Sequence, residues 1–500
     1  MLKAAELYNV YQTKMQKIAD VKYAHAVLEW DTETYLPKKG IEMRNRQMAT
    51  LSEIAHEYLI DEQLGNLLLK LNDCTDLSIY EKRNVELSLI DFNRNKKLST
   101  AFVKKMSESI QTAYHSWVTA RQQNNASNFL EPLQQLINLK KQEAELLGYE
   151  EHPYNALMND YDKGLTVKIV DAVFKNLQPA LSKLIALSQK NNEIDNSFLY
   201  QHFDKDDQWK FGISLLKNMG FDFEAGRQDI SIHPFTTNFN NADVRLTTRI
   251  DENDFSNMTW SCIHEAGHGL YEQGLQSQYY GLPLGEYCSL SIHESQSRIW
   301  ENQVGRGLAY WQHNFPLLKS FFPKQLADIS IDPFYLGINK IQTSLIRTEA
   351  DELTYHFHIM IRYEIEKLLI EGSITAKDIA AYWNELYKKY LGVTVPDDNQ
   401  GYLQDIHWSH GSFGYFATYS TGSLYAAQFY ASIENENLNL NNELAVGNSS
   451  AILKWLRENI HKNGRYYTSE DLCKSATGNY LNANFFIDYA TKKFSTIYKS

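Results

Sequence analysis

The stretch Phe255-Ser-Asn-Met-Thr-Trp-Ser-Cys-Ile-His-Glu-Ala-Gly-His-Gly-Leu-Tyr271 carries the most informative pattern in this chain. Its apolar spacing predicts a helix, and within it stands the HExxH pentapeptide His264-Glu265-Ala266-Gly267-His268. Residues four apart share one helix face, so both imidazoles can reach one metal ion, and Glu265 then lies beside the metal's water and can accept its proton. The alternative is a surface helix with an ordinary pair of histidines.

A catalytic zinc ion needs a third protein ligand and one open position, and a distant residue on the same straight helix cannot supply that ligand. Glycine and proline interrupt the helical pattern further along, so the next segment can fold back as an antiparallel helix. A turn centred near 281–282 places positions 293–299 opposite the two histidines. Either His293 or Glu294 can be the ligand on geometry alone, and Glu301, one turn further, is a weaker candidate.

Two glycines, Gly267 and Gly269, lie inside this predicted helix. Each costs about 1 kcal/mol in a helix interior, so we expect something to approach the helix closely there. Substrate and a small sheet are both possible neighbours, and ordinary packing against another helix is an equal alternative.

The rest of the chain reads as mostly helical. Glycine and proline number only 24 and 10 among 500 residues, which argues against collagen-like, disordered and turn-dense all-β chains. Apolar residues recur at helical spacing from residue 1 to about 220. The stretch 228–250 alternates instead like two short strands, Asp229–Phe235 and Asp243–Ile250, around a turn at Asn238–Asn241. Further helical segments are expected near 255–276, 287–310, 338–370 and 376–391, before a loop at 392–405.

No linker interrupts the sequence, so we expect one large, mainly α domain over 1–500 with one small β-sheet. In this reading, 1–225 is a mostly helical scaffold, 226–430 is the catalytic core, and 431–500 forms C-terminal helices.

The net charge limits the binding partners that the protein can have, and the cysteine content indicates its cellular compartment. The formal net charge of −12 disfavours nucleic acid and anionic membranes as partners. The four cysteines lie far apart without a CxxC pair, which fits a reducing cytosol and leaves histidines and carboxylates as metal ligands. No stretch reaches 18 apolar residues, so we expect a cytoplasmic protein without a membrane segment.

Six motifs in one order resemble the carboxypeptidase Taq family of metallocarboxypeptidases, along most of the chain. They are His233-Pro-Phe235, Asp243-Val-Arg-Leu-Thr247, the HExxH at 264–268, His293-Glu-Ser-Gln296, Ile346-Arg-Thr-Glu-Ala-Asp351 and Gly401-Tyr-Leu-Gln-Asp-Ile-His-Trp408. Six motifs in sequence are far more specific than any one of them.

The resemblance implies that His264, His268 and Glu294 are the metal ligands and Glu265 is the general base, which selects Glu294 over His293. It also implies a saddle-like, nearly all-α fold with a deep groove, a homodimer, and release of single C-terminal residues with broad specificity from peptides with a free C-terminus. The expected cofactor is one divalent ion, Zn²⁺, with Co²⁺ or Mn²⁺ as alternatives.

The oxyanion of the reaction needs donors besides the metal. The segment after His410 supplies Tyr415 and Tyr419, whose hydroxyls are candidates, and His410 is itself a catalytic candidate. We place His233 with the substrate-binding residues, with the alternative that it orients a ligand through a hydrogen bond.

A peptidase that acts at the C-terminus must recognise a free carboxylate, for which the planar fork of arginine is best suited. Arg245, Arg298 and Arg347 are the candidates. Asp243 and Arg245 share one face of a predicted strand, which could border the groove. For Arg347 the alternative is an ordinary helical ion pair with Asp351, one turn on.

Two other functions compete with this reading. A helical oligopeptidase of the thimet type also uses HExxH and a distant glutamate, but cuts internal bonds. A metal- or peptide-binding scaffold without catalysis is the second alternative, and the intact Glu265 argues against it.

Overall fold

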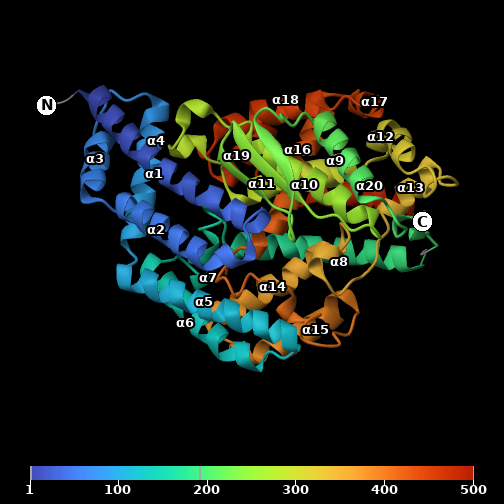
Figure 1. Ribbon diagram of the computed structural model, residues 1–500, viewed down its shortest axis with the longest axis horizontal. Helices are drawn as coiled ribbons and strands as arrows, with labels where there is room; N and C mark the ends of the chain where they lie inside the picture. The colour runs from blue at the N-terminus through green and yellow to red at the C-terminus, as the bar shows by residue number, and fades with distance from the viewer. Residues whose placement is uncertain (1–2, 191–192, 499–500) are drawn as a thin grey trace. The chain divides into compact units, whose positions relative to one another are not determined.

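The computed structural model describes residues 3–190 and 193–498. These residues form a mainly α protein with one small three-stranded β-sheet, which confirms the predicted fold class (Figure 1). The contacts within the chain divide it into two compact units, each built from three separate segments. The prediction that the whole chain is one domain with three successive parts stays a prediction.

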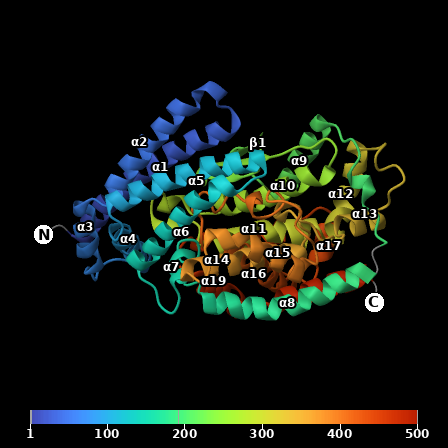
Figure 2. The same cartoon turned by 90° about the horizontal axis from the view of Figure 1, so that it is seen from below.

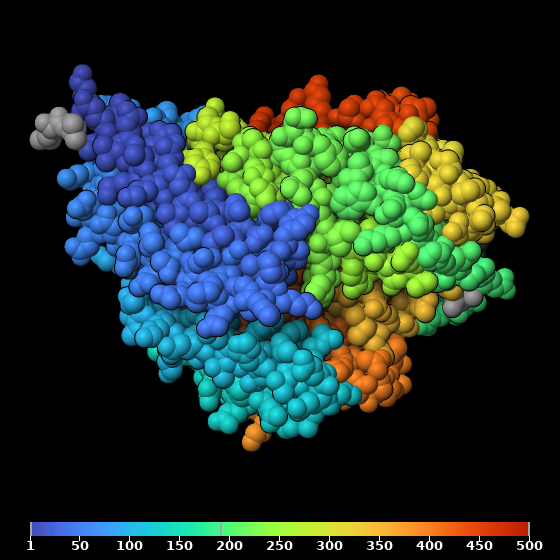
Figure 3. Space-filling model, in the orientation of Figure 1, coloured from blue at the N-terminus to red at the C-terminus, as the bar shows by residue number. Residues whose placement is uncertain are grey.

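The first unit comprises Met1–Lys96, Asp195–Ile338 and Ala426–Tyr480. Its helices are α1 (Ala4–Thr34), α2 (Ile41–Leu59), α3 (Glu62–Asn72), α4 (Ile79–Lys96), α9 (Lys205–Met219), α10 (Phe255–Glu272), α11 (Leu290–Arg298), α12 (Leu308–Phe321), α13 (Ile331–Ile338), α17 (Leu440–Ala445), α18 (Ser450–Asn459) and α19 (Ser469–Thr477). In the space-filling view, the blue surface of α1 and α2 adjoins the green surface around the sheet (Figure 3), and α1 packs against β2 (Thr236–Asn240).

The second unit comprises Lys97–Ile194, Asn339–Tyr425 and Leu481–Ser500. Its helices are α5 (Thr100–Gln123), α6 (Ser127–Leu147), α7 (Pro153–Met158), α8 (Val167–Lys190), α14 (Thr354–Glu371), α15 (Ile379–Leu391) and α20 (Asn484–Ile497). Helix α8 is the long helix at the lower edge of Figure 2, and α20 packs against it. Helix α16 (Phe416–Glu436) begins in this unit and ends in the first.

The sheet contains three strands, where the sequence predicted two around a turn. Strand β1 (Gly226–Ile230) pairs in parallel with β3 (Asp243–Thr248), and β2 pairs antiparallel with the other edge of β3, giving the order β1-β3-β2. The expected turn at Asn238–Asn241 is therefore largely strand. Pro234, which has no N–H to donate, lies in the connection between β1 and β2.

The two glycines of α10 mark its two packing faces. A Cβ atom on Gly269 would lie 2.7 Å from Leu246 Cδ2 of β3, and one on Gly267 would lie 2.5 Å from Ser297 Cα of α11. The sheet is thus the neighbour of Gly269 and a helix is the neighbour of Gly267. Helix α10 packs against both β3 and α11 (Figure 1).

The helix predicted over 287–310 is more divided than its periodicity suggests. Helix α11 begins after Ser289, whose Oγ accepts a hydrogen bond from the Ile292 N–H at 3.1 Å. A π-helical turn, Ile299–Gly305, follows before α12. Such turns widen the helix locally and occur often at functional sites.

The helix predicted over 338–370 begins later than expected: α14 starts at Thr354. The Asp351 carboxylate accepts hydrogen bonds from the N–H groups of Leu353 and Thr354 at 2.9 and 3.0 Å, so it caps this helix instead of lying inside it.

Among the described residues, no helix is both long and apolar enough to cross a membrane.

Candidate metal centre and active site

Helices α10 and α11 bring three side chains of the HExxH region together. His264, His268 and Glu294 each offer one ligand atom, and these atoms all lie within 4.8 Å of one another. Glu294 Oε2 is 3.7 Å from His264 Nε2 and 3.6 Å from His268 Nε2. Three electron-pair donors that converge in this way have the type and number that a catalytic zinc site requires.

The polar atoms of His264 and Glu294 that face away from this cluster have partners that fix the orientation of the two side chains. His264 Nδ1 lies 2.8 Å from Glu301 Oε2, so Glu301 orients this ring. Arg298 donates to Glu294 Oε1 at 2.6 Å and to Glu301 Oε2 at 3.0 Å. Arg298 is therefore engaged with these two glutamates.

The charges around the three side chains do not balance. Four glutamates lie around them: Glu265, Glu272, Glu294 and Glu301. Arg298 pairs with Glu294 and Glu301, and Arg306 pairs with Glu301. With all four carboxyls ionised and the imidazoles neutral, carboxylates outnumber these two guanidinium groups by two in a buried region, where unpaired charge is costly. One divalent cation would balance them, so the residues present fit such an ion.

Glu265 lies on α10 between the two histidines, and a hydrogen bond restrains its side chain. Its Oε2 accepts a hydrogen bond of 2.6 Å from the Thr236 hydroxyl of β2. The residue is 7% exposed, and burial raises the pKa of its carboxyl. The sheet therefore holds the carboxylate of the HExxH glutamate in place.

His293 does not complete the cluster. Its Nδ1 lies 2.6 Å from His268 Nδ1, the ring nitrogen that faces away from Glu294. Its Nε2 lies 2.7 Å from Glu272 Oε1. The choice that spacing left open between His293 and Glu294 thus falls geometrically on Glu294.

In the second unit, Arg347 takes part in a buried ion cluster. It lies in a short 3₁₀ turn and donates to Asp405 Oδ1 at 2.9 Å, so the alternative of a helical ion pair with Asp351 is wrong. Arg362 of α14 donates to the other oxygen, Asp405 Oδ2, at 2.5 Å. Among the described residues, Asp405 is the only carboxylate within ion-pairing distance of either guanidinium, which leaves one positive charge in excess.

The two candidate tyrosines lie at and near the start of α16. The rings of Tyr415 and Tyr419 are 4.9 Å apart, and the Tyr419 hydroxyl lies 3.2 Å from His407 Nε2. Burial and the nearby Arg347 lower the pKa of His407 to about 3, so its ring is neutral at pH 7. His410 is exposed, and its ring packs against Tyr114.

The predicted substrate-binding residues of the sheet region lie in the first unit. Arg245 donates to both oxygens of Asp243, at 2.9 and 3.0 Å, and its guanidinium stacks 4.2 Å from the ring centre of Trp30 and 4.8 Å from that of Phe239. His233 is exposed in the connection between β1 and β2.

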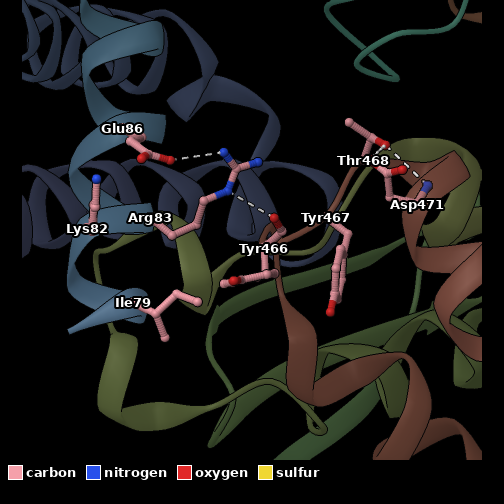
Figure 4. Close-up of a pocket in the computed structure, with 8 residues that line it drawn as sticks. All are labelled: Ile79, Lys82, Arg83, Glu86, Tyr466, Tyr467, Thr468 and Asp471. Atoms are coloured by element: carbon pink, nitrogen blue, oxygen red, sulfur yellow. Dashed lines mark hydrogen bonds and ion pairs between the residues drawn. The ribbon is translucent and has the colours of Figure 1, made fainter.

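A cavity of about 390 Å³ lies elsewhere in the first unit, between α4 and the segment that leads into α19 (Figure 4). Arg83 crosses it, donating to the Tyr466 carbonyl at 2.9 Å and to Glu86 at 3.3 Å. None of the predicted site residues lines this cavity, so we do not assign it to the reaction.

Several residues that hold these two regions were not predicted from the sequence. Thr236, Asn238 and Arg362 had no local signal, because their partners are distant in sequence. Glu272 had one: it stands four residues after His268, so it shares a helix face with both histidines.

Comparisons with known proteins identify relatives of this chain along nearly its whole length. The family model described as carboxypeptidase Taq (M32) metallopeptidase matches residues 10–494. Carboxypeptidase 1 of Bacillus subtilis (strain 168) is 37% identical over 486 residues, covering 97% of this chain and 97% of that protein. The solved M32 carboxypeptidase from Deinococcus radiodurans R1 superimposes with a TM-score of 0.97 at 35% identity, covering 99% of this chain and 100% of that chain.

A further solved structure, named "The Structure of CHT", superimposes with a TM-score of 0.96 at 55% identity, covering 98% of this chain and 99% of that chain. The family match and the similarity to the Bacillus subtilis protein both run over nearly the whole length. The chain therefore belongs to the carboxypeptidase Taq (M32) family of metallopeptidases and is a metallocarboxypeptidase by that membership.

Proposed function

We propose that this chain hydrolyses the C-terminal peptide bond of peptides with broad specificity, using one Zn²⁺ ion held by His264, His268 and Glu294. The observation that carries the proposal is the convergence of their three ligand atoms within 4.8 Å of one another. Co²⁺ and Mn²⁺ have the same charge and are the alternative ions.

In this proposal Glu265 is the general base. A bound divalent ion would lower the pKa of a coordinated water molecule and polarise the scissile carbonyl. Glu265 accepts the proton of the attacking water and returns it to the leaving amine. The hydrogen bond from Thr236 keeps one carboxylate oxygen fixed, which leaves the other for this proton.

For the substrate's terminal carboxylate we favour Arg347 over Arg245. The excess positive charge that Arg347 and Arg362 leave around Asp405 is suited to an anion. Arg245 already has a carboxylate partner, Asp243, on its own strand. Arg298 has two such partners, so we exclude it from this role.

We further propose that Tyr415 or Tyr419 donates a hydrogen bond to the oxyanion, and we keep His410, His233 and Asp243 as secondary candidates around the substrate. The family resemblance supports a homodimer, and the cysteine usage supports a cytoplasmic location; both are proposals here.

The test is to offer the zinc-loaded protein a peptide with a free C-terminus and its amidated twin. We expect stepwise loss of C-terminal residues from the free peptide and little cleavage of the amidated one. A chelator should abolish the activity while circular dichroism stays unchanged, because a core of this size does not need the ion to fold. Efficient cleavage of the amidated peptide would favour the oligopeptidase, and no cleavage of either would favour the silent scaffold.

A further inference from the structure

A chain of short polar contacts runs from the sheet to His268. Asn238 of β2 donates from Nδ2 to Glu272 Oε2 at 2.7 Å, and the other oxygen of Glu272 lies 2.7 Å from His293 Nε2. His293 Nδ1 then lies 2.6 Å from His268 Nδ1. Glu272 is 3% exposed, so water does not substitute for these contacts at its carboxylate.

If His268 binds the metal through Nε2, the positions of the protons on His268 and His293 follow from the hydrogen bonds. A neutral imidazole carries one proton, so that proton then lies on His268 Nδ1 and is donated to His293 Nδ1. His293 must therefore carry its own proton on Nε2, which it donates to the Glu272 carboxylate. Each donor meets an acceptor, and no other arrangement of neutral rings satisfies all three groups.

We propose that Glu272 and His293 are positioning residues for His268: they set its tautomer and ring orientation and thereby the affinity of the site for its ion. This inference rests on the proposed role of His268 as a ligand. Neither residue touches substrate or the reacting atoms in this scheme, and both act through the His268 ring.

The two histidine ligands are then supported differently. His264 contacts a carboxylate directly, and that carboxylate, Glu301, is shared with Arg298 and Arg306. Among the described residues, no lysine or arginine pairs with Glu272, whose ion-pair partner is His293. Glu272 is therefore not shared with a lysine or an arginine, whereas Glu301 is shared with two arginines.

A purely structural role is the competing explanation, because these contacts also join α10 to α11 and to the sheet. The two explanations differ in what they predict for metal affinity. A structural role lowers the unfolding temperature of the metal-free protein, whereas a positioning role weakens zinc binding even in variants that remain folded.

The experiment measures the zinc dissociation constant by competition with a chromophoric chelator. Glu272→Ala and His293→Ala should each weaken zinc binding roughly 10- to 100-fold, the usual effect of losing a partner behind a metal ligand. Glu272→Gln keeps an acceptor and His293→Gln keeps both a donor and an acceptor, so each should bind zinc more tightly than the matching alanine variant. Glu286→Gln is the matched control, because this carboxylate lies between α10 and α11 but pairs with Arg465.

The double variant Glu272→Ala/His293→Ala gives the sharpest result. If both residues act through His268 as one chain, the double variant should bind zinc about as weakly as the single His293 variant. Folded single variants with unchanged zinc affinity, or losses that simply add, would overturn the proposal. His264→Ala separates this outcome from failure of the proposed metal site, because zinc binding that survives in that variant would contradict the ligand assignment itself.

Discussion

The HExxH region of the first unit and the Asp405 cluster of the second unit are opposites in charge. Around His264 and His268, the three carboxylates Glu272, Glu294 and Glu301 outnumber the two guanidinium groups, whereas around Asp405 two guanidiniums share one carboxylate. Both regions are buried, so neither imbalance is screened by water as it would be at the surface.

The sign of the excess charge in each region therefore indicates the charge of the partner that the region can bind. Under the proposed function, the first region holds a divalent cation and the second binds an anion such as the substrate's terminal carboxylate. A peptidase that acts at a free C-terminus needs both kinds of site.

The largest effect is expected from Glu265→Gln in the first region. The variant should lose at least about 100-fold in kcat, because general-base catalysis typically contributes 100- to 10,000-fold. It should keep its zinc, since Glu265 is not a proposed ligand. Steady-state kinetics and metal analysis of the purified protein check both expectations.

Glu294→Ala is the matched variant and should instead weaken zinc retention. If Glu265→Gln lost the metal while Glu294→Ala kept it, the two glutamates would have to exchange roles.

In the second region, Glu366 offers a test by pH. It accepts hydrogen bonds from Trp408 Nε1 and the Gly414 N–H, both at 2.8 Å, and from the Tyr154 hydroxyl. Burial nevertheless raises the pKa of Glu366 to about 7 from its ordinary 4.5. A raised pKa means that the folded protein binds the proton more tightly than the unfolded chain does.

The stability from this proton is fully present below pH 4.5 and is lost as the pH rises to about 7. The loss should amount to roughly 3 kcal/mol. Unfolding midpoints of the wild type and Glu366→Gln, measured across this window, should show a flatter pH dependence in the variant. Parallel curves would mean that Glu366 is ionised throughout. Asp405 serves as the contrast: burial is outweighed by Arg347 and Arg362, which hold its pKa well below the usual range.

Arg347→Ala tests whether the second region binds the substrate's carboxylate. A charge-assisted bidentate contact contributes about 2–3 kcal/mol, so kcat/KM for free peptides should fall roughly 30- to 150-fold. Activity on amidated peptides should barely change, because they lack the carboxylate.

Arg245→Ala is the control for this experiment and should reduce the cleavage of both peptides equally, if at all. A selective loss of the free peptide in Arg245→Ala, with equal losses in Arg347→Ala, would move the role to the strand arginine.

The two regions also differ in how far the sequence could predict them. The HExxH helix, the fold-back after it and the window containing Glu294 all follow from local spacing, because ligands on one helix and its hairpin partner are near in sequence. The choice between His293 and Glu294 could not be made that way, since it depends on the direction of each side chain from α11.

The Asp405 cluster had no comparable signal. Arg347 was expected in a helix with Asp351, but Asp351 caps the following helix and Asp405 is the real partner. Strand β1 was placed a few residues too late, because its first residues, beginning with Gly226, have little β-propensity and its partner β3 is not its sequence neighbour. Contacts between distant segments are what local patterns cannot supply.

The smallest effect is expected where α10 touches α11. A methyl group at position 267 would lie 2.5 Å from Ser297 Cα and 2.6 Å from the Gln296 carbonyl oxygen, so Gly267→Ala must push the α11 backbone away. The cost of such overpacking is typically about 1–3 kcal/mol. Because α11 carries Glu294, zinc affinity should fall together with the unfolding midpoint.

Gly269→Ala is the matched control on the same helix. Its methyl group meets the ends of the Leu246 and Phe221 side chains, which can move, and the substitution improves helix propensity by about 1 kcal/mol. Calorimetry and zinc competition on both variants decide the matter, and equal losses in the two would show that the close approach of the α10 and α11 backbones does not set the metal geometry.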